Sequence, residues 1–457
     1  MMRVLDLFSG AGGMSLGFEA AGAVPVGAVE WDAAAAATWK RMFGASGARI
    51  FGGPEEGDVN RIPVHDLIAA LPARPDVVVG GPPCQGFSQI GRAKLRSLLD
   101  SEAQIELGVR NPERNELYRY FLAAVSVARP LAFVMENVPG MRGLLGVDHA
   151  GRIAREAASL GYNVRYFLLN AADFGVPQHR WRLFFVGLRS DLGVHALPRP
   201  PVRTHRGAGS LPEATSIPDD PWMTEALPIA PDARGPVTAW EALDDLPRLR
   251  KHLDGVRDIP AVGTYRAIHS DYAAVMRAWA GHLPQDSVED HWFRSTPRDF
   301  PIFAEMAEDD RYPEALQIAH RRLSAALAAR RRAGLQVDEA EMAALQKEYI
   351  PPYRNDAFSD KWRKLSMDEP SWTVTAHLSK DSYSHIHYDS SQARTITVRE
   401  AARLQSFPDS FRFTGSFGAR FRQVGNAVPP LLARALCLNL FQQLRELGVD
   451  FDKRQAA

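Results

Sequence analysis

Short apolar runs of strand length alternate with helical stretches through the first half of the chain. Residues 14–21 have the apolar spacing of a helix, and similar stretches separate the other runs. Apolar runs separated by helices indicate parallel strands that are buried on both faces. The pattern therefore predicts a doubly wound, mostly parallel α/β sheet within residues 1–188. The predicted strands are residues 4–8, 24–29, 76–79, 131–135 and 182–186.

Polar or glycine-rich landmarks follow four of the predicted strands. The loop at residues 9–13 follows the first strand, and Glu30 follows the second. Cys84 comes just after the third strand and Glu136 after the fourth. Ligands of open α/β sheets bind at the carboxyl ends of the strands, so we expect these landmarks to converge on one crevice.

The residues after the first two strands indicate a cofactor that contains a nucleoside. Glycines in the 9–13 loop let a ligand approach the backbone, and the next helix offers free N–H groups. Glu30 lies twenty positions after Gly10, where an acidic side chain can bind ribose hydroxyls. Trp31 could stack on an adenine, and Asp58 could accept from its amino group. For the loop alone, an ordinary strand-to-helix turn is the alternative.

Cys84 stands on a stiff turn within Gly-Gly-Pro-Pro-Cys-Gln-Gly-Phe-Ser, residues 80–88. Glycine and proline end the preceding strand abruptly and hold the thiol at its carboxyl end. A free cysteine is usually a buried structural residue, but the polar neighbours Gln85 and Ser88 fit a nucleophile better. The other cysteine, Cys437, lies in an apolar helix and is expected in the core. Two cysteines imply no disulfide framework and favour a reducing cytoplasm.

Composition narrows the class of partner only slightly. The chain has 457 residues, which favours two or three domains. Lys and Arg total 54, as do Asp and Glu, so the net charge neither indicates nor excludes a nucleic acid. We find no signal peptide before the first strand and no apolar stretch long enough to span a bilayer, so no membrane partner is expected.

The second half of the chain is less regular. Residues 196–236 are rich in proline and glycine and predict a linker or an extended stretch. Residues 314–349 have helical spacing with arginines off the apolar face. Phosphate contact and a solvated charged face explain those arginines equally well. Residues 371–388 alternate like a strand.

Six motifs, in this order, resemble those of the DNA (cytosine-5)-methyltransferase family. They are residues 6–13 (Asp-Leu-Phe-Ser-Gly-Ala-Gly-Gly), 82–85 (Pro-Pro-Cys-Gln), 136–138 (Glu-Asn-Val), 178–182 (Gln-His-Arg-Trp-Arg), 397–405 and 423–430. The resemblance covers about residues 1–188 and 361–440. It implies a Rossmann-like methyltransferase fold that binds S-adenosylmethionine, with a second, smaller domain that recognises the target DNA.

The resemblance also implies the chemistry. The thiolate of Cys84 would add to carbon 6 of cytosine and make carbon 5 nucleophilic. Glu136 would protonate or hydrogen-bond the ring nitrogen beside the amino group, and Arg180 and Arg182 would fix the carbonyl oxygen. The target atoms lie inside a base pair, so the cytosine must be flipped out. Residues 89–116 would close over it as a mobile flap, the alternative being a long surface loop.

Further site residues follow from the matched motifs. The cofactor, converted to S-adenosylhomocysteine, would contact Phe8, Gly10, Gly12, Gly13, Glu30, Trp31, Asp58, Val59, Pro82, Leu117, Asn426 and Ala427. No metal is expected. Residues that read base edges or hold phosphate would be Gln85, Ser88, Arg92, Lys361, Arg363, Lys364, Thr373, Thr375, His377 and Lys380.

The sequence thus predicts an enzyme that methylates carbon 5 of cytosine in a specific double-stranded DNA sequence. Its predicted parts are a catalytic domain (1–188), a target-recognition domain with a linker and helical insert (189–419), and a returning C-terminal segment (420–457). We expect a cytoplasmic, nucleoid-associated monomer, with a restriction endonuclease or defence proteins as candidate partners. The alternatives are a tRNA cytosine-5 methyltransferase, whose Cys-Phe-Thr signature we do not find, and a non-catalytic DNA-binding regulator.

Overall fold

The computed structural model describes most of the chain. The described residues are 1–83, 117–142, 148–207, 220–224, 227–256, 263–279, 287–353 and 361–451. Cys84 and the predicted flap at residues 89–116 therefore lie outside the described residues.

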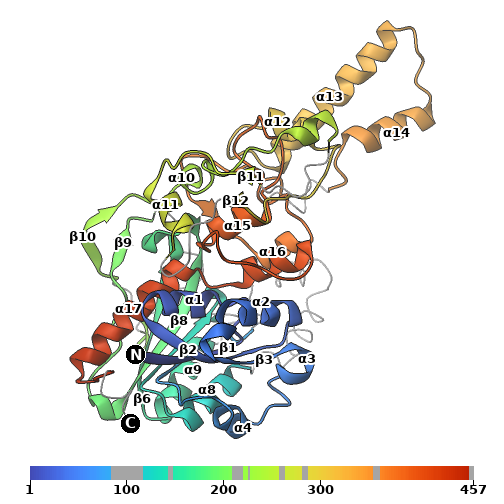
Figure 1. Ribbon diagram of the computed structural model, residues 1–457. Helices are drawn as coiled ribbons and strands as arrows, with labels where there is room; N and C mark the ends of the chain where they lie inside the picture. The colour runs from blue at the N-terminus through green and yellow to red at the C-terminus, as the bar shows by residue number, and fades with distance from the viewer. Residues whose placement is uncertain are drawn as a thin grey trace.

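The described residues contain a seven-stranded sheet at one end of the molecule (Figure 1), in the order β3-β2-β1-β4-β5-β8-β6. Every neighbouring pair is parallel except those of β8, which runs antiparallel to β5 and β6. The doubly wound, mostly parallel sheet predicted from the sequence is confirmed. The strands are β1 (Met2–Leu7), β2 (Ala23–Glu30), β3 (Arg49–Gly52), β4 (Val77–Gly80), β5 (Ala132–Asn137), β6 (Tyr162–Asn170) and β8 (Trp181–Arg189).

Helices cover both faces of this sheet because its central strands are apolar on both sides. In β4, Val77 and Val79 pack in the core shared with α1 (Gly13–Ala20) and α17 (Pro430–Glu446). Val78 faces the opposite core. That core contains α4 (Val64–Ala69), α8 (Leu117–Ala128) and α9 (His149–Ser159). Each buried valine or leucine contributes about 1.5–3 kcal/mol.

Helix α17 is the last helix of the described chain and belongs to the core. Cys437 lies on it and is fully buried, as predicted. The segment Phe417–Glu446 is long and apolar enough to cross a membrane by length and composition alone, which the sequence analysis had ruled out. However, 61% of its most apolar window is buried inside the protein. Its hydropathy is therefore that of a core helix.

Above the sheet, α15 (Val398–Leu404) and α16 (Phe417–Asn426) pack beside α2 (Ala33–Phe43) and the short helices α10 (Ala239–Leu243) and α11 (Asp271–Arg277). A buried ion cluster fixes α15, because Arg403 binds Asp245 at 3.0 Å and Asp409 at 2.6 Å. The remaining short elements are α3 (Gly53–Glu56), β7 (Gln178–His179), β9 (Arg203–His205), β10 (Ile229–Arg234), β11 (Gly263–Thr264), β12 (Ser287–Val288) and β13 (Ser371–Trp372).

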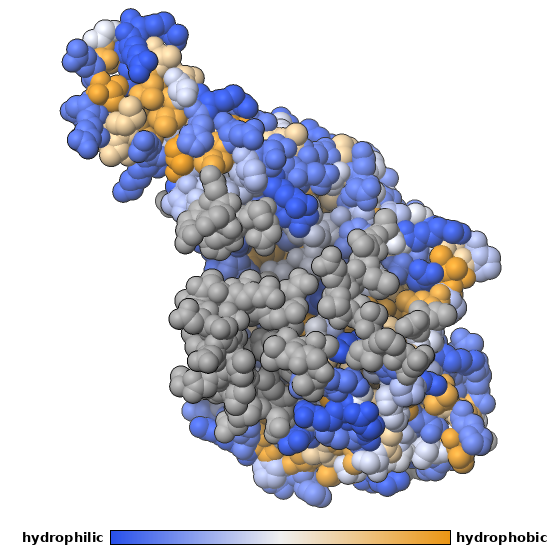
Figure 2. Space-filling model, turned by 180° about the vertical axis from the view of Figure 1, so that it is seen from behind, coloured by the Kyte–Doolittle hydropathy of each residue, from blue (hydrophilic) through white to orange (hydrophobic). Residues whose placement is uncertain are grey.

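A separate small core lies far from the sheet. It joins α12 (Phe300–Glu305) to the first turns of α13 (Tyr312–Arg332) and to Trp362 and Tyr383. Helix α13 and its partner α14 (Glu339–Tyr349) then project as an arm at the top of Figure 1. Figure 2 shows hydrophobic surface on this arm. Leu335, which lies between α13 and α14, is exposed.

The arm corrects one detail of the sequence prediction. The helical stretch predicted over residues 314–349 is two helices, broken at Gly334, which has a positive φ of 72°. Two of its arginines, Arg321 and Arg322, bind Glu305 of α12. These pairs show that part of the arm's positive charge is used within the protein.

Candidate active site

The glycine loop after β1 has little freedom to change. Gly12 has a φ of 94°, and a Cβ there would lie 2.5 Å from the ring of Phe43. A Cβ on Gly13 would lie 2.4 Å from the carbonyl oxygen of Val428. Gly10 also has a positive φ, 56°, but its Cβ position faces open space. Two glycines therefore serve close packing, and the third leaves room for a ligand beside the backbone.

Glu30 lies at the end of β2, directly beside this loop. Its carboxylate accepts hydrogen bonds from the backbone N–H groups of Gly10, at 2.8 Å, and Asp32, at 2.7 Å. Burial raises the pKa of Glu30, while these two bonds oppose the rise. Each carboxylate oxygen keeps a second acceptor position, so two further donors can be bound.

The other residues predicted to contact the cofactor lie on neighbouring elements. Trp31 is 59% exposed, so its indole is open to a stacking partner. Asp58 follows Gly57, whose Cβ position would lie 2.1 Å from the carbonyl oxygen of Glu30. Val59 is buried in the core next to the sheet, and Phe8 makes an edge contact with Tyr120 of α8. Leu117 is half-buried at the start of the same helix.

A residue that the sequence analysis passed over lies beneath the loop. Asp6 is buried in β1 and accepts a 2.6 Å hydrogen bond from Ser15, which in turn accepts from the indole N–H of Trp39. Burial raises the pKa of Asp6 to about 7. The signal was a charged residue inside an apolar strand run, which is costly unless it is hydrogen-bonded.

The turn after β4 is tied to the end of β5. A Cβ on Gly80 would lie 2.2 Å from the carbonyl oxygen of Leu7, so only glycine fits there. Asn137 donates a 3.4 Å hydrogen bond to the carbonyl oxygen of Pro82. At Gly81, the Cβ position lies 3.1 Å from the carboxylate of Glu136. The turn that leads to Cys84 therefore runs alongside Glu136.

Glu136 is held by a charged partner on the neighbouring strand. Arg182 of β8 donates from Nε to its carboxylate at 2.8 Å, and each side chain is 15% exposed. Because β8 is antiparallel to β5, the start of β8 lies at the carboxyl end of β5. The pair therefore stays accessible at the same sheet edge as Glu30 and the glycine loop.

Arg180, two residues earlier, is placed differently from its predicted role. Its guanidinium is 2% exposed and donates to the carbonyl oxygens of Val374, at 2.8 Å, and Gly425, at 3.1 Å. Burial lowers its pKa. Arg180 was predicted to fix the carbonyl oxygen of the base, but its guanidinium instead joins three parts of the chain to one another.

The C-terminal part of the chain closes the loop side of the site. Asn426 is the last residue of α16 and is exposed. The Cβ of Ala427 lies 3.1 Å from the Cβ position of Gly13. The structure thus places Ala427 against the glycine loop, over four hundred positions earlier in the chain, and Asn426 directly precedes it.

The recognition segment, residues 361–388, contradicts part of the sequence prediction. Lys364 was expected to contact DNA, but it is fully buried and donates to the carbonyl oxygens of Phe303 and Met306, at 3.0 and 2.7 Å. Burial lowers its pKa to about 8. Lys361 forms a 2.9 Å ion pair with Asp381 and is 13% exposed. Both charges are therefore committed within the protein.

Arg363 lies between these two lysines and is half-buried. Its guanidinium stacks 3.7 Å from the ring centre of Trp372, which also donates a 2.6 Å hydrogen bond to the carbonyl oxygen of Ser384. The alternation of inward and outward side chains leaves Arg363 as the residue of the Lys361–Lys364 stretch best placed to face a partner.

The predicted long strand at residues 371–388 is wrong. Only Ser371–Trp372 forms a strand, β13, which pairs with the two-residue strand β7. Two residues after β13, the backbone N–H of Val374 binds the side chain of Gln178 instead of a strand. Helix α16 then packs so closely that a Cβ on Gly425 would lie 2.2 Å from the nitrogen of Ala376. The chain turns into the 3-10 helix η8 (Ala376–Ser379).

The remaining predicted DNA residues divide by exposure. Thr373 donates to the carbonyl oxygen of His179 at 2.7 Å and is half-buried. Thr375 and His377 are also half-buried, and Lys380 is exposed. Gln85, Ser88 and Arg92 lie outside the described residues, as Cys84 does. Among the described residues no group of acidic, histidine and cysteine side chains could hold a metal ion.

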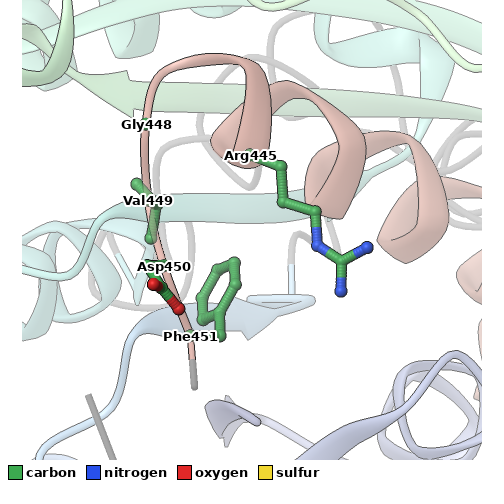
Figure 3. Close-up of a pocket in the computed structure, with 5 residues that line it drawn as sticks. All are labelled: Arg445, Gly448, Val449, Asp450 and Phe451. Atoms are coloured by element: carbon green, nitrogen blue, oxygen red, sulfur yellow. The ribbon is translucent and has the colours of Figure 1, made fainter. Parts of the chain in front are cut away.

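A hollow of about 330 Å³ lies elsewhere, at the end of α17. Figure 3 shows Arg445 projecting from the last turn of this helix beside Val449, Asp450 and Phe451. An adjoining hollow is lined by Met1 and Gly22, which precede β1 and β2. These hollows therefore lie at the opposite edge of the sheet from Glu30 and Glu136.

Comparison with known proteins gives a consistent result. A family model described as C-5 cytosine-specific DNA methylase matches residues 2–228 and 302–442, a wider span than the motifs alone had indicated. M.OihORF3336P of Oceanobacillus iheyensis is 36% identical over 95% of this chain and 94% of its own. Two proteins named type II methyltransferases follow. M.AgeI of Thalassovita gelatinovora is 30% identical (95% and 98% covered), and M.XorII of Xanthomonas oryzae is 31% identical (97% and 85% covered).

A solved structure agrees with the fold. The crystal structure of an E. coli prophage protein superposes with a TM-score of 0.59 at 23% identity, covering 97% of this chain and all of that one. The likeness supports the Rossmann-like architecture of the sheet.

Proposed function

The chain belongs to the C-5 cytosine-specific DNA methylases, and from this premise we propose how its residues carry out the reaction. It is a DNA cytosine-5 methyltransferase that uses S-adenosylmethionine. Our finer proposal is that it acts on a cytosine flipped out of a specific double-stranded sequence, through a covalent adduct between Cys84 and carbon 6.

The pair of Glu136 and Arg182 carries this proposal. A carboxylate held by an arginine, beside the turn that leads to a cysteine, is the arrangement needed to activate a pyrimidine ring. Glu136 would bind the ring nitrogen and Arg182 the carbonyl oxygen, so electrons that arrive at carbon 6 are stabilised within the ring. Arg180, which directly precedes β8, ties the start of that strand to the carbonyl oxygens of Val374 and Gly425.

The thiolate of Cys84 forms a bond to carbon 6, and the ring electrons move to carbon 5. S-adenosylmethionine would supply an electrophilic methyl group: carbon 5 bonds to this methyl, the bond from the methyl to the sulfonium sulfur breaks, and S-adenosylhomocysteine is the product. Carbon 5 then loses its proton to a base, the electron pair re-forms the ring double bond, and the bond to Cys84 breaks. The enzyme is regenerated without a metal.

The described residues fit the cofactor. Open space at Gly10 admits a ligand against the backbone, and Glu30 keeps acceptor positions for ribose hydroxyls. The exposed Trp31 offers a stacking face. Asp58 follows Gly57, which packs against the backbone of Glu30, and would accept from an adenine amino group. Asn426 and Ala427 would close the other end, together with Pro82 and Leu117.

The biological setting remains part of the proposal. The names of M.AgeI and M.XorII identify those proteins as type II methyltransferases, which supports a restriction-modification role here. We propose a cytoplasmic monomer on the nucleoid, with a cognate endonuclease as partner.

Trapping the covalent adduct tests the proposed chemistry. DNA containing 5-fluorocytosine should trap the wild type irreversibly, because fluorine cannot leave carbon 5 as a proton does. Cys84→Ser should lose methylation and trapping while it keeps S-adenosylmethionine affinity, since a hydroxyl is rarely ionised near neutral pH. Cys437→Ala, in the core, should still be trapped. Turnover by Cys84→Ser, or no adduct with the wild type, would reject the proposal.

A further inference from the structure

Two buried glutamine side chains join separate parts of the chain beneath the candidate active site. Gln178 lies on β7 and Gln405 directly follows α15, and both are fully buried. Gln178 donates from Nε2 to the side-chain oxygen of Gln405 at 2.5 Å and to the carbonyl oxygen of Leu404 at 3.0 Å. Gln405 donates from its own Nε2 to the carbonyl oxygen of Ala427 at 2.5 Å.

The partners at each end fix the direction of this chain of hydrogen bonds. The oxygen of Gln178 accepts from the backbone N–H of Val374 at 2.8 Å, so its nitrogen must face Gln405. The carbonyl oxygen of Ala427 can only accept, so the nitrogen of Gln405 must face it. Neither amide can be reversed without leaving buried groups unpaired, which is costly inside a protein.

The chain of bonds ends at the wall of the glycine loop. Ala427 and Val428 are the closest neighbours of the Cβ position of Gly13, at 3.1 and 2.4 Å. Ala427 also follows Asn426, the exposed end of α16. A displaced Ala427 would therefore move the C-terminal side of the proposed cofactor site, although Gln405 itself is too deeply buried to reach a ligand.

We propose that Gln405 is a positioning residue that sets the affinity for S-adenosylmethionine by holding Asn426 and Ala427 against the glycine loop. This inference rests on the proposed cofactor site. It assigns the glutamine a role in binding that goes beyond stability, because one of its two hydrogen bonds supports the site directly. The other bond connects the same support to β7 and to Val374 of the recognition segment.

The chain offers a matched control on α17. Gln443 is 4% exposed, accepts from the backbone N–H of Arg199 at 2.8 Å and donates to the carbonyl oxygen of Arg199 at 3.2 Å. Like Gln405, it is buried and hydrogen-bonded through both its side-chain oxygen and its nitrogen. It lies more than three helical turns beyond Pro430, away from the glycine loop.

Calorimetry of the full chain without DNA tests the inference, with thermal unfolding measured alongside. Gln405→Met keeps the volume but removes both hydrogen bonds. It should weaken S-adenosylmethionine binding by about tenfold, the effect of leaving a buried carbonyl oxygen without its donor. Gln443→Met should lose similar thermal stability but bind as the wild type does. In steady state, Gln405→Met should raise KM for the cofactor and leave kcat at saturation nearly unchanged.

A second variant covers the case in which Gln405→Met does not fold. Gln405→Asn keeps an amide but is too short to reach both Gln178 and Ala427, so it should also weaken cofactor binding. Wild-type affinity in the folded Gln405 variants would overturn this inference and leave the proposed function intact. Failure of the wild type itself to bind S-adenosylmethionine would overturn both.

Discussion

The carboxyl edge of the sheet was predicted well from the sequence, whereas the recognition segment was not. At the sheet edge, Glu30, Glu136 and the glycine loop lie where the strand pattern places them, although 126 positions separate Gly10 from Glu136. In the recognition segment, Lys364 is basic and near the matched motifs, yet it is buried under α12. In the sheet, the position of a residue along a strand predicts where its side chain lies. In the irregular recognition segment, residue type alone does not predict whether a side chain is exposed.

The largest effect that tests the sheet edge is expected from Glu136→Gln. The amide can still accept from Arg182, so the local structure should persist, but proton donation to the ring is lost. General acid catalysis contributes about 10²–10⁴-fold, and we expect the methylation rate to fall by that factor. Single-turnover methylation at saturating cofactor measures it, with S-adenosylmethionine affinity as the control for folding. If the methylation rate falls by less than tenfold, Glu136 is not the general acid, although it lies at the sheet edge beside the other predicted residues.

The regular part of the fold was predictable because each strand end is a fixed point in space. Once β1, β2, β4 and β5 are parallel neighbours, their carboxyl ends must share one edge. The Glu136–Arg182 pair adds the antiparallel strand β8, whose reversed direction the apolar run alone could not reveal. The family resemblance identified the motif, but only the register of β8 shows that Arg182, and not Arg180, faces Glu136.

The prediction for the irregular recognition segment was wrong for two physical reasons. Val374 and Leu378 are buried as the alternation predicts, but beyond β13 the backbone has no partner strand. The N–H of Val374 binds the side chain of Gln178, and α16 packs against Ala376. The prediction that the basic residues contact DNA was wrong for Lys361 and Lys364, because a carboxylate or a backbone carbonyl group inside the protein can bind a lysine as DNA phosphate does. Asp381 and Met306, the partners of Lys361 and Lys364, are identifiable only once the chain is folded.

Arg363→Ala tests whether Arg363, the residue of the Lys361–Lys364 stretch best placed to face a partner, reads bases. A bidentate contact between arginine and guanine provides about 1–3 kcal/mol of discrimination, so the variant should relax site choice at one position. Methylated sites in a random-sequence DNA pool, read by sequencing, give the answer. Arg331→Ala, on the exposed arm, removes an equal charge and should leave site choice unchanged. Unaltered selectivity in Arg363→Ala would place recognition elsewhere, for example between residues 250 and 350.

The pH dependence of stability tests whether Lys364 has a purely structural role, in contrast to the DNA contact proposed for Arg363. Its pKa is about 8 in the folded protein, below the ordinary 10.5. Between these values the unfolded chain binds more protons, so the free energy of unfolding attributable to Lys364 rises with pH. Denaturant unfolding at pH 7 and pH 10 should show a larger increase for the wild type than for Lys364→Met. Equal increases would mean that burial does not lower the pKa of Lys364.

The smallest effect is expected at Lys380, which is exposed at the end of η8. A lysine that meets only phosphate weakens binding to all sequences alike, so Lys380→Ala should preserve site choice. Its loss should reduce the slope of log affinity against log salt by about 1. Binding isotherms across a salt series measure this slope, and Lys347→Ala, exposed on α14, is the matched control. If Lys380→Ala and Lys347→Ala both keep the wild-type slope, the η8 end of the recognition segment does not face DNA. A reduced slope with unchanged site choice would instead divide the segment into a reading residue, Arg363, and a phosphate contact, Lys380. The function of the segment would then depend on a few outward side chains. At the sheet edge, by contrast, the strand backbone positions the side chains of the site.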